Sequence, residues 1–123
     1  MEQENLNKII KFFFTVQLLV KLYHWNTTSY SRHKATDDFL EKLADNVDKF
    51  TEVYIGKYNV KPSVENIKLE ASFLNDNDII SLFTQSREFL NEMNSYNLES
   101  DLLNIRDEIL ADVNQTLYLF NLK

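Results

Sequence analysis

Apolar residues recur at intervals of three and four along most of the chain, the period of a helix with one buried face. Four stretches carry this pattern: about 5–26, 32–57, 76–96 and 98–122. The polar run from Thr27 to Ser31 separates the first two and predicts a short turn between antiparallel helices. Residues 58–75 contain Pro62 and show no sustained period, so they predict a long connection.

That connection is long enough to return the chain to the other end of the molecule. Fully extended, it spans about 55 Å, whereas a second helix of about 25 residues is only about 38 Å long. Helices two and three can therefore run parallel, which is the ferritin-like connectivity. A single glycine and a single proline leave few helix breakers. We expect one all-α domain over residues 1–123, a ferritin-like four-helix bundle with a long crossover.

The first helix is apolar around more of its circumference than one core requires. Its core positions are predicted to be Ile9, Ile10, Phe12, Phe13, Val16, Leu19, Val20 and Tyr23. A further stripe consists of Phe14, Leu18, Leu22 and Trp25. Since a helix hydrophobic on several sides is buried on several sides, this stripe predicts contact with a neighbouring subunit.

Composition narrows the classes of function. The sequence has no cysteine, so thiolate metal sites and disulfides are excluded. Its net charge is −6 and no terminus carries a basic cluster, so we expect no DNA binding. The apolar stretch of the first helix is interrupted by Lys11, Gln17 and Lys21, which argues against a signal peptide or membrane span. We therefore expect a protein of the cytoplasm, or of a host cytoplasm, without a membrane partner.

Both histidines lie close to the first turn, and acidic residues follow on the second helix. With about 100° of rotation per residue, His33, Asp37, Asp48 and Glu52 lie on one polar face of that helix. Asp37 and Asp48 are about 16 Å apart along the axis, too far to share one ion. Both pairs, Asp37 with Asp48 and His33 with Glu52, are centred between residues 42 and 43. A two-fold axis at that point, where Ala44 allows close approach, would build two identical clusters across a dimer.

Such a cluster of imidazoles and carboxylates favours a first-row divalent metal, with iron and manganese ahead of calcium and magnesium. His24 completes the predicted ligand set with His33, Asp37, Asp48 and Glu52. Trp25, beside His24, is a candidate electron donor, although a packed interface residue is the alternative interpretation.

The pattern His24-Trp25-Asn26, His33-x3-Asp37 and Asp48-x3-Glu52 resembles the ferroxidase signature of the Dps family, the miniferritins. The resemblance implies a hollow dodecamer of two-fold dimers that oxidises Fe(II) with hydrogen peroxide or oxygen and stores ferric iron. It implies di-iron sites, or mono-iron sites with a water. His24, with Asp48 and Glu52 of a partner, would then hold the tighter iron, and His33 and Asp37 the second position.

A second hypothesis comes from a different class of function. A metal-free helical protein could keep the same scaffold for structural or partner-binding duties. The number of metal ions bound per chain distinguishes this hypothesis, which expects none, from the ferroxidase hypothesis.

Overall fold

A computed structural model describes residues 1–63, 65 and 67–122. Its elements are α1 (Glu2–Asn26), α2 (Tyr30–Tyr58), α3 (Asp76–Glu92), the short 3-10 helix η2 (Met93–Tyr96) and α4 (Ser100–Phe120). The described part of the chain contains no strand. The expected all-helical, four-helix bundle is confirmed, and each predicted helix lies within a few residues of its expected range.

Side-chain caps explain where α2 and α3 begin. The hydroxyl of Ser29 accepts from the backbone N–H of Arg32 (3.2 Å) at the start of α2. Asn75 and Asp78 form a reciprocal capping box at the start of α3, each side chain accepting from the other's backbone N–H. At the end of α2 the chain reverses at Asn59, which has a left-handed φ of 53°.

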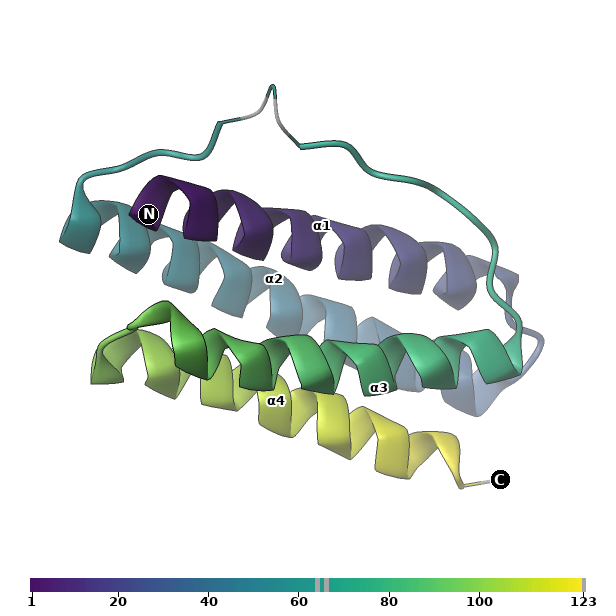
Figure 1. The fold of residues 1–123 in the computed structure, drawn as a ribbon. Coiled ribbons are helices and arrows are strands. Elements are labelled where there is room, and N and C mark those ends of the chain that lie inside the picture. The colour runs from purple at the N-terminus through teal and green to yellow at the C-terminus, as the bar shows by residue number, and fades with distance from the viewer. Residues whose placement is uncertain (64, 66, 123) are drawn as a thin grey trace.

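The helices form two layers, α1 with α2 and α3 with α4 (Figure 1). The short turn makes α1 and α2 antiparallel, and residues 59–75, here called the crossover, carry the chain back along the bundle past α1. Consequently α3 starts at the same end as α2, and the two run parallel. We call the end with the α1–α2 turn the turn end.

Two contacts attach the beginning of the crossover to α1. The side-chain amide of Gln3 donates to the carbonyl oxygen of Lys61, and the backbone N–H of Ser63 donates to Oδ1 of Asn7 (2.8 Å). These hydrogen bonds satisfy polar groups of Lys61 and Ser63, which lie outside the helices. They attach residues 61–63 to the first two turns of α1.

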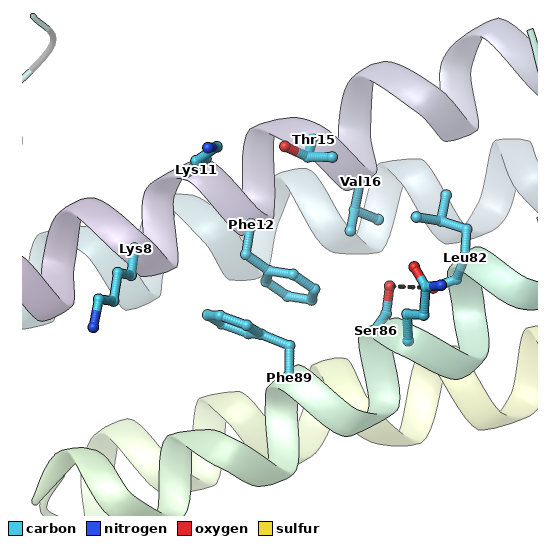
Figure 2. A pocket seen from close by; sticks show the side chains of 9 residues that line it. Lys8, Lys11, Phe12, Thr15, Val16, Leu82, Ser86 and Phe89 are labelled. Atoms are coloured by element: carbon cyan, nitrogen blue, oxygen red, sulfur yellow. Dashed lines mark hydrogen bonds between the residues drawn. The ribbon is translucent and has the colours of Figure 1, made fainter. Parts of the chain in front are cut away.

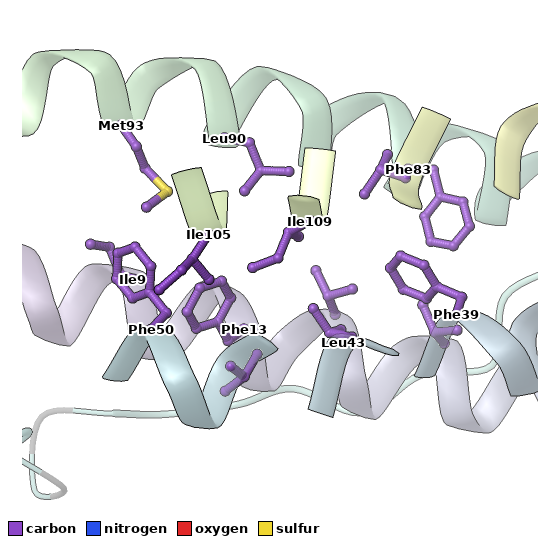
Figure 3. Close-up of a cluster of buried hydrophobic side chains, with 14 of the residues drawn as sticks. Ile9, Phe13, Phe39, Leu43, Phe50, Phe83, Leu90, Met93, Ile105 and Ile109 are labelled. Carbon is purple, nitrogen blue, oxygen red and sulfur yellow. The ribbon is translucent and has the colours of Figure 1, made fainter. Parts of the chain in front are cut away.

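Aromatic rings fill much of the core between the two layers (Figure 3). Phe83 of α3 meets Phe39 of α2 edge-on (4.8 Å between centroids) and stacks on Phe120 of α4 (5.2 Å). Nearer the other end, Phe13 of α1 packs edge-on against Phe50 of α2 (5.6 Å). Ring pairs with these geometries join helices from both layers.

Some apolar residues predicted for the core are only half-buried. On α1 and α3 these are Phe12, Leu19, Leu82 and Phe89. α1 and α3 meet less closely than α1 and α2 or α2 and α4 do. The seam between α1 and α3 is therefore the least filled side of the bundle.

At the turn end, the guanidinium of Arg32 connects all four helices. It donates to the hydroxyl of Tyr23 (3.1 Å) and to the carbonyl oxygens of Asp76 (3.3 Å) and Phe120 (3.3 Å). It also lies 4.8 Å from the centroid of the Phe120 ring. Tyr23 in turn donates to Oδ1 of Asp76 (2.7 Å). The positive charge lies against the last carbonyls of α4, where the helix dipole favours a cation.

At the opposite end, other side chains tie the helices together. Arg106 of α4 is buried and donates to the carbonyl oxygen of Leu90 (2.6 Å), near the end of α3. The hydroxyl of Tyr54 donates to the carbonyl oxygen of Glu2 (2.8 Å). Lys57 of α2 forms ion pairs with Glu99 (3.5 Å) and Asp101 (3.3 Å) beside the start of α4.

Within the residues that the structure describes, no helix combines the length and the apolar character that crossing a membrane requires.

We predict that Arg32→Met lowers the free energy of unfolding by about 2 kcal/mol, because it leaves several polar groups at the turn end without their charged partner. The matched control is Arg87→Met, which removes one exposed guanidinium whose hydrogen bond, within the described part of the chain, is to Asn114 (3.3 Å). The control should change stability by no more than about 0.5 kcal/mol. Urea denaturation followed by circular dichroism measures both. Equal losses in the two variants would contradict a special role for Arg32.

Candidate functional site

His24 and His33 lie on either side of the α1–α2 turn, and we call this pair the histidine clasp. Nδ1 of His24 lies 2.9 Å from the carbonyl oxygen of His33, and Nδ1 of His33 lies 2.9 Å from the carbonyl oxygen of His24. The two rings stack with centroids 3.9 Å apart and planes 17° apart. The structure therefore brings His24 and His33 together within one chain, a contact that was not predicted from the sequence.

The acceptors determine the tautomers. A carbonyl oxygen can only accept, so each Nδ1 must carry the proton, and in the neutral rings each Nε2 keeps its lone pair. The Nδ1–H of His24 also lies 2.9 Å from a second acceptor, Oγ1 of Thr36. The Thr36 hydroxyl itself donates to the carbonyl oxygen of Arg32 (2.8 Å). Thr36 is completely buried and was not predicted as part of this site. Its position three residues after His33 is the only sequence signal for it.

The environment of His24 favours the neutral imidazole. Its side chain is buried, and burial is the largest cause that lowers the pKa of His24 below 6.5; the neighbouring His33 imidazole lowers it further. The hydrogen bond to the His33 carbonyl opposes these effects but is the smaller contribution. His24 therefore acts here as a neutral, structural hydrogen-bond donor.

Of the other predicted ligands, Asp37 lies near enough for its carboxylate to raise the pKa of His24, as the smallest of the contributions, whereas Asp48 and Glu52 lie farther along α2. Asp37, Asp48 and Glu52 are exposed, as is His33. Among the described residues, no group of three or more His, Cys, Asp or Glu side chains comes close enough within one chain to hold a metal ion. A cluster completed by a second subunit is not visible in one chain, so the shared site stays a prediction.

Trp25, the predicted electron donor, points outward. Its side chain is 66% exposed, and Nζ of Lys21 lies 5.3 Å from its ring centroid. Such a cation–π contact holds the ring at the surface of α1. Both interpretations of Trp25, electron donor and interface residue, therefore stay predictions.

Two apolar grooves border α1. One, of about 400 Å³, lies between α1 and α3 around Phe12 and Phe89. The other, of about 530 Å³, lies between α1, α2 and the crossover, with Ile10 and Phe14 beside the carboxylates of Asp48 and Glu52. Sequence reasoning missed both grooves, because neither is formed by one element alone.

The family model DUF5856, described as a family of unknown function, matches residues 24–120. The chain belongs to the DUF5856 family. The match includes α2, α3 and α4, and only the last residues of α1. No curated protein matches the sequence. No solved structure matches it either.

Membership in DUF5856 corrects the Dps assignment, since the family model that matches is not that of the miniferritins. The physical reason is that His33-x3-Asp37 and Asp48-x3-Glu52 are also what a solvated helix face produces at a spacing of four residues. On α2 these four side chains are exposed. His24, which the motif made a ligand, is buried and hydrogen-bonded to the turn.

We predict that the free energy of unfolding falls as the pH is lowered below about 6.5, the unfolded pKa of histidine. The lowered pKa of folded His24 means that the unfolded state binds the proton first, so this stability is complete above that pH and lost below it. Urea titrations between about pH 7.5 and pH 5.5 measure the slope.

The matched variant is His24→Asn, whose amide nitrogen can still donate to the His33 carbonyl but does not titrate. Its stability should depend less on pH across the same range. An unchanged slope in this variant would assign the pH dependence to other groups.

Proposed function

We propose that this protein is a helical interaction protein that pairs with a second copy of itself through the outer face of α1. The observation that carries the proposal is the stripe of Phe14, Leu18, Leu22 and Trp25, here called the outer stripe. Phe14 is 42% exposed and Trp25 is 66% exposed. Leu18 and Leu22 are half-buried and are outside the set of side chains that pack in or against the core.

Helix geometry places the outer stripe opposite the core. With about 100° per residue, the buried residues of α1 centre about half a turn away from Leu18. An apolar stripe that the subunit's own core does not use marks an interaction surface. The aromatic members are typical of the residues that contribute most to binding.

A second copy suits this stripe because its spacing is self-complementary. In an antiparallel pair with a two-fold axis at Leu18, Leu18 faces its own copy. Phe14 faces Leu22 of the second copy, since each lies four residues from the axis. Such a pair is isologous and closes as a dimer.

The charges on α2 favour α1 as the paired helix. Antiparallel pairing of α2 between residues 42 and 43 would set Asp37 against Asp48 of the second copy. Two exposed carboxylates facing each other repel unless a cation lies between them. The outer stripe of α1 needs no cation. Iron binding and ferroxidase activity would require the α2 arrangement, and no contact within the described residues of one chain supports it.

We predict that the protein is a dimer at tens of micromolar by light scattering on a sizing column, with or without EDTA. Leu18→Glu should give a monomer with unchanged helicity, because it puts a charge at the centre of the outer stripe. Ala44→Glu, on the exposed face of α2, makes the same change of charge and should remain a dimer.

The opposite results would decide against the proposal. A dimer that EDTA dissociates, or that Ala44→Glu but not Leu18→Glu dissociates, would assign pairing to α2 and a metal. A wild-type monomer at this concentration would remove self-association altogether.

A further inference from the structure

The groove between α1 and α3 is a second surface, distinct from the outer stripe. Figure 2 shows the rings of Phe12 and Phe89 facing each other across the seam, with Lys8 beside them on α1. The groove holds about 400 Å³, within the usual range of small-molecule sites. Its lining residues are Lys8, Lys11, Phe12, Thr15, Val16, Leu82, Gln85, Ser86 and Phe89.

The floor of the groove is apolar and preformed. The Phe12 and Phe89 rings stack with centroids 4.2 Å apart and planes 15° apart, so they close the seam beneath the groove. Ser86 is buried, and its hydroxyl donates to the carbonyl oxygen of Leu82 (2.8 Å). Because the Ser86 hydroxyl already donates its proton, it offers a ligand no hydrogen-bond donor, and the group that rests on the two rings is best apolar.

The rim of the groove is positive. Lys8 and Lys11 are exposed, and neither ammonium group has an ion pair or hydrogen bond to another described residue. No Asp or Glu is among the lining residues. Two lysines three positions apart on a helix also repel each other, which an anion between them would relieve.

We propose that this groove binds a free apolar monocarboxylate of medium chain length. The chain lies along Phe12, Val16, Leu82 and Phe89, and the carboxylate lies at the Lys8 end. The stretch of α1 from Lys8 to Val16 is about 12 Å long, which limits the chain to medium length. A protein helix is the weaker candidate, because the groove is confined to about two turns of each helix.

The second groove, between α1, α2 and the crossover, provides an internal comparison. It is also lined by apolar side chains, among them Ile10, Phe14 and Leu69, but its charged members are Asp48 and Glu52. The two grooves therefore differ in the sign of the charge beside a similar apolar surface. A carboxylate should distinguish them, whereas a purely hydrophobic ligand should not.

The test is an NMR titration of the full chain with monomeric decanoate. Decanoate should shift the amide signals of Phe12, Leu82, Ser86 and Phe89 at saturation, with one site per chain. Acetate, which lacks the chain, and decylammonium, which reverses the charge, should leave those signals unchanged. Lys8→Gln should weaken decanoate binding about two- to fivefold, as expected for one exposed charge. Lys34→Gln, an exposed lysine of α2 outside the groove, should leave it unchanged.

Three results would overturn the proposal. Equal shifts with decylammonium would show that charge does not select the ligand. Shifts at Ile10 and Phe14 in place of Phe12 and Phe89 would assign the ligand to the other groove. Shifts with acetate alone would show that the lysines attract anions without using the apolar floor.

Discussion

The arrangement of the bundle depends on one guanidinium. Arg32 starts on α2 and reaches the hydroxyl of Tyr23 on α1, the first residue of α3 and the last residue of α4. A planar group with five donors can serve several acceptors at once, which lysine cannot do. The contact at the beginning of α3 also anchors the far end of the crossover. The long connection therefore arrives at a definite place, although among its described residues only Val60, Ile67 and Leu74 pack against the core.

Beside this guanidinium, His24 and His33 use their polar groups to hold the turn. Both Nδ1 atoms and both backbone carbonyls of His24 and His33 are used inside the turn. The two histidines that suggested metal ligands thus hold the α1–α2 turn together through their Nδ1 atoms. The acidic residues of α2 remain exposed and separate, as charged residues on a solvated helix face normally are.

α1 differs from the other helices because its apolar surface exceeds what the core can bury. One part, at Phe12, forms the floor of the α1–α3 groove, and another, from Phe14 to Trp25, forms the outer stripe. Around α1, Phe12 lies about 120° from Leu18, whereas Lys11 on the groove rim lies close to the outer stripe. A second copy on the stripe therefore leaves the Phe12 and Phe89 rings uncovered but contacts the Lys11 edge of the groove. Self-association and ligand binding are therefore proposals that stand or fall separately.

The sequence by itself determined the helices, their order and the crossover, because these follow from local periodicity, caps and the reach of an extended chain. It also placed His24 and His33 beside one short turn, although it did not predict that their rings stack. Only the tertiary structure decided that His24 faces inward, that Thr36 and Arg32 complete the turn end, and that Phe12 meets Phe89. Periodicity specifies which face of a helix is buried but not which distant side chain fills it. A polar pattern on a helix surface is likewise the same whether it binds a metal or only water. For this reason the ligand motif suggested a family that the DUF5856 match did not support.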